Sequence, residues 1–465
     1  MIRITALAIG ILAPSTFADV FLVPDQYPTI TQAISAAESA STSPHTIIVG
    51  PGTYNESLII NQPNLTIQSS DGADSTVIDA ADIYYRCVDV NPTATNFILF
   101  GFTLQNGYTI NNGAGIRSDA SNTAVESCTI QDCTAQLSGG AFYGSQSVLL
   151  EDCLIQRNTG SAAIYEAATS AVINVNNCTF IDNASRAIYS NQGSLTVTNS
   201  DFITSSNSFG FIDFNYPSNG SSHTIQNCTF TGATERAVNW AASDYSELNI
   251  SECSFNSSQV GVYIRPGRAS ITNSQFTDCT TGILTSVAPT QGVQISTCTF
   301  AKNTGSQGSA LDNDDSDAVV LSDSTFCENT VPAILGNYES LGGNIFLSDC
   351  DTITGACCLG SSCVALTEVD CGFAGGQFSG FSRDCSTTEC VVAPVIGACC
   401  VNGNAITLEE SDCSLVSGQF FGEGSTPDDV SCESDSSCPE DLDGNGEVGF
   451  PDLLEIISAW GPCSG

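Results

Sequence analysis

The sequence predicts a mainly β protein: a right-handed parallel β-helix followed by disulfide-rich modules and a small α calcium-loop unit. A motif recurs nine times with a period of about 25 residues, and a period of this size is typical of a solenoid. Each copy has an aliphatic residue, two variable positions, a small residue, a polar residue and a large apolar residue. The copies are Val125–Ile130, Leu150–Ile155, Val175–Phe180, Val197–Phe202, Ile225–Phe230, Ile250–Phe255, Ile271–Phe276, Ile295–Phe300 and Leu321–Phe326.

Apolar residues alternate within each copy, which indicates strands rather than helices. Val148 and Leu150 are followed by Cys153 and Ile155, each pair two positions apart, as in a strand with one buried face. A second short strand is expected after each copy, with Asn, Asp, Gly and Ser in the turns. We therefore expect about ten coils, each paired in parallel with the next, since one unit of this size makes one coil. The second strands are expected at 141–143, 163–165, 187–189, 260–264 and 283–284.

Two side-chain ladders are predicted inside this solenoid. The small position is Cys in six copies, and we interpret it as a compact apolar filler, because Ser replaces it at Ser200, Ser274 and Ser324. Disulfides between stacked coils are the alternative. Asn side chains that hydrogen-bond from coil to coil are expected five residues later, at Asn158, Asn183, Asn303 and Asn329.

The first coils carry a family resemblance. Residues 27–34, "YPTITQAI", predict a short amphipathic helix that covers the open lower end of the stack. With "TIIVGPGTYNESLII" at 46–60 and "LTIQSSDGADSTVIDA" at 65–80, this segment resembles the opening of secreted right-handed parallel β-helix proteins of the pectin-lyase-like group. The resemblance implies a β-helix over residues 19–350. It leaves the activity open, because that fold carries lyases, hydrolases, esterases, adhesins and proteins without known chemistry.

Export is predicted from the first 18 residues. Arg3, the apolar run Ile4–Ala13 and the small residues before Asp19 have the form of a signal peptide (residues 1–18), with a membrane anchor as the alternative. Ten Lys plus Arg against 50 Asp plus Glu give a formal charge of −40, which excludes nucleic acid and anionic lipid as partners. No later apolar run is long enough to insert in a membrane. We expect a secreted, extracellular or cell-surface protein.

Two matching cysteine-rich modules are expected after the solenoid, at residues 355–390 and 397–438. Both begin with "GACC", and segments this small require cross-links to remain folded. The second module has Ala405 where the first has Cys363, so we predict disulfides Cys363–Cys390 and Cys438–Cys463. The other pairings stay open, and zinc binding by adjacent cysteines is the alternative.

Residues 439–463 contain a calcium-binding loop. Asp441, Asp443 and Asn445 occupy positions 1, 3 and 5 of a twelve-residue loop, with Glu447 offering its backbone carbonyl and Asp452 closing the loop. This predicts Ca²⁺ as cofactor. The loop and the following apolar helix resemble one repeat of a type I dockerin. Dockerins have two repeats, so we expect a calcium-stabilised end module or attachment signal here rather than a cohesin-binding domain.

Catalytic residues are weakly indicated. Asp312, Asp314 and Asp315 form an acidic cluster between two expected strands, and Arg265 resembles the arginine base of pectate lyases of this fold in composition only. A solvated turn is the alternative for the cluster. His223 is expected to be a core residue. A stripe of tyrosines is a candidate surface for sugar rings, with partly buried strand ends as the alternative: Tyr108, Tyr143, Tyr165, Tyr189 and Tyr263.

These observations favour a secreted, non-catalytic rod that acts as a surface or matrix protein. Binding to an extracellular polysaccharide or cell-surface component, with tethering through the C-terminal module, is the activity we consider first. The alternative is a calcium-dependent polysaccharide lyase or glycoside hydrolase that acts on acidic polysaccharides, for which a pair of carboxylates would have to converge. A third interpretation is a structural spacer without a ligand.

Overall fold

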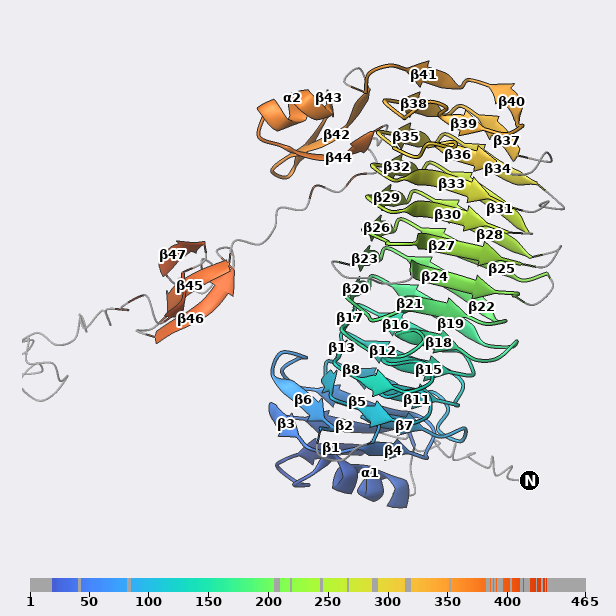
Figure 1. Cartoon of the computed structure of the whole chain (residues 1–465). Coiled ribbons are helices and arrows are strands. Elements are labelled where there is room, and N and C mark those ends of the chain that lie inside the picture. Colours follow the sequence, from blue (N-terminus) through green and yellow to red (C-terminus); the bar gives the residue numbers. More distant parts are fainter. Residues whose placement is uncertain are drawn as a thin grey trace, which may run out of the picture. The chain divides into compact units, whose positions relative to one another are not determined.

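A parallel β-helix forms most of the computed structural model (Figure 1). The structure describes residues 19–40, 43–81, 85–204, 210–217, 220–242, 246–265, 267–286, 292–313, 319–350, 353–381 and, with gaps, 385–432. A complete coil contributes one strand to each of three parallel sheets, named sheets A, B and C. These sheets contain 14, 13 and 12 strands, so the predicted number of coils, about ten, was too low. The shortfall arises because the first and last coils lack the repeated motif.

The strands of each sheet follow one another in register, with one coil between neighbours. Sheet A contains β1 (Asp19–Val23), β2 (His45–Val49), β5 (Leu65–Ser69), β8 (Ile98–Phe100), β12 (Thr123–Glu126), β16 (Val148–Glu151), β19 (Val172–Asn176), β22 (Ser194–Thr198), β25 (Ser222–Gln226), β28 (Glu247–Ser251), β31 (Arg268–Thr272), β34 (Val293–Ser296), β37 (Val319–Ser322) and β40 (Glu339–Gly342). Sheet B contains β3 (Gly52–Tyr54), β6 (Thr76–Asp79), β9 (Thr103–Gln105), β13 (Thr129–Gln131), β17 (Leu154–Gln156), β20 (Thr179–Ile181), β23 (Asp201–Ile203), β26 (Thr229–Thr231), β29 (Ser254–Asn256), β32 (Gln275–Thr277), β35 (Thr299–Ala301), β38 (Thr325–Cys327) and β41 (Ile345–Leu347). Sheet C contains β4 (Leu58–Ile60), β7 (Val88–Val90), β11 (Ile116–Ser118), β15 (Phe142–Gly144), β18 (Ile164–Glu166), β21 (Arg186–Ser190), β24 (Gly210–Asn215), β27 (Arg236–Ala241), β30 (Val260–Ile264), β33 (Thr281–Thr285), β36 (Leu311–Asn313) and β39 (Ile334–Leu335). A separate pair joins β10 (Tyr108–Thr109) to β14 (Thr134–Ala135).

The repeated motif makes the sharp corner between sheets A and B. The variable residue directly before the small position has a positive φ in all nine copies, and it is Asn or Asp in six of them, the residues other than glycine that adopt this left-handed conformation most readily. The small side chain then turns into the core. Cys128 donates to the carbonyl of Glu126 at 3.2 Å, and Ser200 makes the equivalent bond to Thr198 at 2.8 Å. Ser and Cys are therefore interchangeable here because both fill the space and satisfy the same carbonyl.

Stacked apolar residues fill the interior. The phenylalanines that end the last seven motifs stack from coil to coil, starting at Phe180, and the stack continues to Phe346, with ring centroids 4.7–4.9 Å apart. The cysteines of the interior are buried free thiols, as expected for filler residues. The Asn ladder is also confirmed: the amide of Asn158 donates to the carbonyl of Ile130 at 2.8 Å and to Asn183 at 3.1 Å.

Helix α1 (Ile30–Ser39) covers the end of the stack beside β1, β2 and β4. It starts later than the predicted 27–34 because Thr29 is the N-cap, whose side chain accepts a hydrogen bond from the Gln32 N–H at 3.2 Å. Its buried face is Ile30, Ala33, Ile34 and Ala37.

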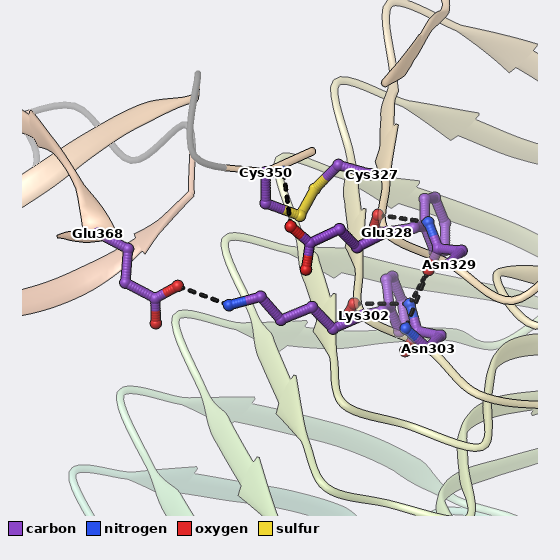
Figure 2. The surroundings of a disulfide bond; sticks show 9 residues. Lys302, Asn303, Cys327, Glu328, Asn329, Cys350 and Glu368 are labelled. Carbon is purple, nitrogen blue, oxygen red and sulfur yellow. Dashed lines mark hydrogen bonds and ion pairs between the residues drawn. A yellow bond between two sulfur atoms is a disulfide. The ribbon is translucent and has the colours of Figure 1, made fainter. Parts of the chain in front are cut away.

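A disulfide that the sequence did not predict closes the last coil (Figure 2). Cys327 at the end of β38 is bonded to Cys350, whose N–H donates to the Glu328 carboxylate at 3.1 Å. Nearby, Lys302 donates to Glu368 at 2.8 Å.

The two cysteine-rich modules are small three-stranded sheets. Module 1 contains β42 (Thr354–Leu359), β43 (Ser362–Thr367), α2 (Glu368–Phe373) and β44 (Gln377–Phe381). Module 2 contains β45 (Ile396–Val401), β46 (Asn404–Glu409) and β47 (Gln419–Glu423), paired antiparallel. The chain divides into two compact units, the first with the β-helix and parts of module 1.

The predicted Cys363–Cys390 disulfide is wrong. Cys363 is bonded to Cys385, and Cys390 to Cys358. The pairs that both modules share have the same separations, 14 residues for Cys357–Cys371 and Cys399–Cys413 and 32 residues for Cys358–Cys390 and Cys400–Cys432. Cys390 therefore corresponds to Cys432, not to Cys438 as the prediction assumed. Module 2 lacks the whole third bridge, because Ala405 and Pro427 occupy its two positions.

Candidate functional site

One row of outward-facing residues along sheet C carries the candidate site. The central residue of each short strand points out because its neighbours on either side are buried, as for Tyr143 between Phe142 and Gly144. In-register pairing aligns these positions from coil to coil. From β4 to β39 the row reads Ile59, Asp89, Arg117, Tyr143, Tyr165, Tyr189, Asp213, Asn239, Tyr263, Leu284, Asp312 and Leu335.

Three tyrosines in this row form a stacked ladder. The rings of Tyr143 and Tyr165 are 5.7 Å apart and within 9° of parallel, and those of Tyr165 and Tyr189 are 5.0 Å apart and within 16°. All three side chains are half-buried. Burial raises the pKa of the Tyr165 and Tyr189 hydroxyls above their ordinary value, with smaller contributions from neighbouring residues such as Tyr143 beside Tyr165. These hydroxyls therefore remain protonated hydrogen-bond donors at neutral pH.

The predicted tyrosine stripe is thus present but shorter than expected. Tyr143, Tyr165 and Tyr189 belong to it. Tyr263 lies in the same row three strands beyond Tyr189 and packs against two arginines, Arg236 at 4.4 Å and Arg265 at 5.3 Å from the ring centre. Tyr108 lies on β10, outside sheet C.

A hollow opens at the N-terminal end of the ladder, with a volume of about 350 Å³. Its charged groups form a continuous network. Arg117 contacts Asp89 at 3.3 Å and also pairs with Asp119, while Arg86 contacts the other oxygen of Asp89 at 3.4 Å. The Arg86 and Asp89 side chains are 9% and 10% exposed. The hollow is lined by Arg86, Asn111, Asn112, Arg117, Asp119 and Tyr143.

A smaller polar cluster lies at the other end of the ladder. Arg186 pairs with Asp213 at 2.5 Å, and the Asn239 amide donates to the same carboxylate at 2.5 Å. Arg236 and Glu235 contribute a further pair at 3.9 Å. The Arg186 guanidinium also lies 5.5 Å from the centre of the Tyr189 ring. Polar groups of both charges therefore flank the aromatic ladder on both sides.

The basic residues of this acidic chain are concentrated on sheet C. Five of its ten Lys and Arg residues lie on strands of this sheet or within two residues of one: Arg86, Arg117, Arg186, Arg236 and Arg265. Sequence reasoning missed the hollow, because Asp89, Arg117 and Asp119 are far from any recognisable motif. One signal in the sequence could have indicated the hollow. Arg117 lies at the outward-facing centre of a three-residue strand, and basic residues are rare in this chain.

The predicted catalytic candidates are only partly described. Asp312 lies on β36 in the row of sheet C, and Arg265 directly follows β30, two strands away, or about 10 Å along the stack. Asp314 and Asp315 lie outside the described residues. His223 is fully buried, with the Ser221 hydroxyl 2.9 Å from one ring nitrogen, and burial lowers its pKa to about 4. His223 is therefore a core residue, as predicted.

The predicted calcium ligands also lie outside the described residues, as do residues 1–18 and the predicted Cys438–Cys463 disulfide. The ligands are Asp441, Asp443, Asn445, Glu447 and Asp452. In the part of the chain that is described, no cluster of three or more His, Cys, Asp or Glu has the arrangement of a metal site. Among the same residues, no helix has the length and apolar character that crossing a membrane requires.

The chain belongs to the right-handed β-helix family. The model for the right handed beta helix region matches residues 61–215 and 218–370. The comparison with curated protein sequences gives no match.

Several solved structures are similar to this chain. The catalytic domain of a GH87 α-1,3-glucanase in complex with nigerose has a TM-score of 0.52 and 12% identity, covering 73% of this chain and 70% of that one. The A-module of a mannuronan C-5 epimerase from Azotobacter vinelandii has a TM-score of 0.45 and 15% identity, covering 69% and 93%. A pectin methylesterase in complex with a hexasaccharide has a TM-score of 0.36 and 17% identity, covering 47% and 80%. At these identities the likeness concerns the fold alone.

Proposed function

We propose that this chain is a secreted, non-catalytic β-helix that binds an extracellular glycan along the outer face of sheet C. The observation that carries the proposal is the ladder of Tyr143, Tyr165 and Tyr189 with a polar cluster at each end. Aromatic rings supply apolar contact, and the adjoining Asn, Asp and Arg groups supply hydrogen bonds in fixed positions. This combination suits sugars, which present both C–H faces and hydroxyl groups.

The ladder also defines how a glycan would lie. The tyrosine rings stack on one another, so the middle ring presents its edge and hydroxyl outward rather than an open face. Only the end rings have one face without a tyrosine neighbour. A glycan chain would therefore run along the row, with hydrogen bonds to the hydroxyls and sugar stacking at the ends.

Secretion and tethering are parts of the same proposal. Six disulfides among the described residues are typical of an oxidising compartment, which fits export directed by residues 1–18. The loop at 441–452 would bind Ca²⁺ and fold the end module, held by Cys438–Cys463. That module would tether the β-helix to a surface or matrix.

A hydrolase or lyase is the second candidate, and one observation favours it. Asp119 lines the hollow beside Tyr143, and Asp89 contacts the same Arg117 guanidinium, so two carboxylates flank one arginine. Glycosidases require such a pair. We place this candidate second because Asp89 uses both oxygens in ion pairs with Arg86 and Arg117. Such an enzyme would be the one that the sequence suggested, a calcium-dependent lyase or hydrolase that acts on acidic polysaccharides.

A binding and turnover experiment tests the proposal. The full-length protein is incubated with a panel of neutral and acidic oligosaccharides, and both bound ligand and released products are measured. We expect saturable binding without product release, and at least tenfold weaker binding for Tyr165→Ala. Tyr108→Ala is the matched control, because Tyr108 lies outside sheet C, and it should bind normally. Product release that is lost in Asp119→Asn would instead support the enzyme.

A further inference from the structure

We propose that the hollow beside Tyr143 is the anchoring subsite and that its ligand is a neutral sugar unit rather than a uronate or a sulfated sugar. This inference rests on the proposed glycan-binding function and specifies the class of glycan.

The charges of the hollow compensate one another. Arg86, Arg117 and Asp119 line it, and Asp89 is paired with both guanidiniums, so this network of two guanidiniums and two carboxylates has no net charge. Both guanidiniums are already paired: Arg86 with Asp89, and Arg117 with Asp89 and Asp119. A uronate carboxylate would have to displace one of these aspartates from Arg117 or lie close to it without compensation. In either case the free energy of breaking or opposing the existing ion pair offsets the free energy gained from the new contact with Arg117.

The rest of the chain adds repulsion for acidic polymers. The formal charge is −40, and interactions between exposed charges extend over about 8 Å at physiological ionic strength. A long acidic polysaccharide is therefore repelled wherever its units come within this range of exposed acidic side chains, whereas a neutral polysaccharide is not. A protein adapted to acidic polymers would be expected to have a net basic binding face.

The polar groups of the hollow are held in place for hydrogen bonding. The Arg86 Nε donates to the carbonyl of Asn112 at 3.1 Å, and Asp119 accepts from the Ser145 hydroxyl at 2.8 Å. These contacts fix the donors and acceptors before a ligand arrives, which lowers the entropy cost of binding. Asn111, Asn112 and Tyr143 complete the lining with amide and hydroxyl groups. Such a lining matches sugar hydroxyls, which both donate and accept.

The position of the hollow sets the direction of the glycan. Arg117, Tyr143, Tyr165 and Tyr189 occupy successive strands, so Arg117 and Tyr189 are separated by three steps, or about 14 Å. A neutral unit anchored in the hollow would direct the rest of the chain over the tyrosine ladder. The affinity should therefore rise with oligosaccharide length until the ladder is covered.

Linkage-matched pairs of oligosaccharides test the inference. Neutral glucan, mannan and galactan oligosaccharides are compared with counterparts in which each primary hydroxyl is oxidised to a carboxylate. Dissociation constants are measured calorimetrically with the full-length protein at low and high salt. We expect the best neutral ligand to bind at least tenfold more tightly than its oxidised counterpart, with part of this preference lost at high salt.

The variant Asp119→Asn provides a second test, because it removes one of the two carboxylates that are paired with Arg117. This variant should gain at least tenfold in affinity for the oxidised ligand relative to the neutral one. Asp132→Asn is the control, since Asp132 is also paired with an arginine, Arg157, but lies outside sheet C. Equal or tighter binding of the oxidised ligands by the unmodified protein would overturn the inference while leaving glycan binding intact. Absence of binding to every oligosaccharide would overturn the proposed function and this inference together.

Discussion

The rings of Phe255 and Phe276 lie 4.7 Å apart and within 3° of parallel, in the middle of a continuous stack of phenylalanines. Each ring occupies the same position of the motif in successive coils, and both residues are fully buried. Each coil therefore packs its ring against the rings of the two adjacent coils. The stability of one coil depends mainly on these neighbours.

Replacement of Phe255 by Ala should lower the free energy of unfolding by about 3–5 kcal/mol, because it removes a buried ring and leaves a cavity between two neighbours. Denaturant unfolding followed by circular dichroism measures the loss. Ile203→Ala is the control, since Ile203 is 41% exposed on the same sheet and should change stability by less than about 1 kcal/mol. Equal losses for the two variants would show that the stack is not the main source of stability.

Removal of the Cys327–Cys350 disulfide should loosen the last coil. The bond closes a segment of 23 residues, and loops of this size are stabilised by about 3 kcal/mol. Phe346, within this segment, is 55% exposed and packs on Phe326 on one side, so the coil buries less apolar surface than the coils of the interior. The double variant C327S/C350S should be cleaved by protease first within 328–349.

The matched control for this disulfide variant is Cys298→Ser. Ser occupies the same position of the motif in three other copies, so this replacement should leave the protease-resistant core unchanged. Cleavage of the double variant at the same rate as the unmodified protein would contradict the role of the disulfide.

The buried thiols should make stability fall at high pH. Burial raises the pKa of Cys279 and Cys298 to about 12, whereas a thiol in the unfolded chain ionises near 8.5. Stability from these groups is therefore complete below the unfolded value and is lost as pH rises through the folded value, by about 1.4 kcal/mol per thiol per pH unit. Guanidinium unfolding at a series of pH values measures this loss.

The same burial predicts unreactive thiols. Under native conditions near pH 8, iodoacetamide should leave both cysteines unmodified, and in denaturant it should modify both, as read by mass spectrometry. Modification of Cys279 at equal rates in the two conditions would contradict the burial that the structure shows.

Calcium should bind through the loop at 441–452. Isothermal titration of the full-length protein should detect one site, and Asp443→Ala should weaken it by at least about tenfold, because Asp443 supplies a charged ligand at position 3. Asp71→Ala, an exposed aspartate of an early turn, serves as the control and should retain the affinity. Binding unchanged in Asp443→Ala would place the calcium site elsewhere.

The repeated architecture and the tyrosines of the ladder were predictable from sequence, whereas the charged hollow beside the ladder was not. Val125–Ile130 and its copies specify a strand, a corner and a second strand through local residue preferences, so the sheets and the Asn ladder could be expected. The network of Arg86, Asp89 and Arg117 depends on side chains from successive coils that meet only through register. The pairing of Cys390 was predicted incorrectly because the prediction matched Cys390 to Cys438. The equal sequence separations of the disulfides in the two modules match it to Cys432 instead.

The most direct measurement of the central claim is the location of a bound glycan. A photoreactive derivative of the tightest-binding neutral oligosaccharide is cross-linked to the full-length protein, and labelled peptides are identified by mass spectrometry. The account predicts labels within 86–90, 111–119, 142–145, 164–166 and 186–190, suppressed by excess unlabelled ligand. Competable labels confined to sheets A and B or to module 2 would contradict it.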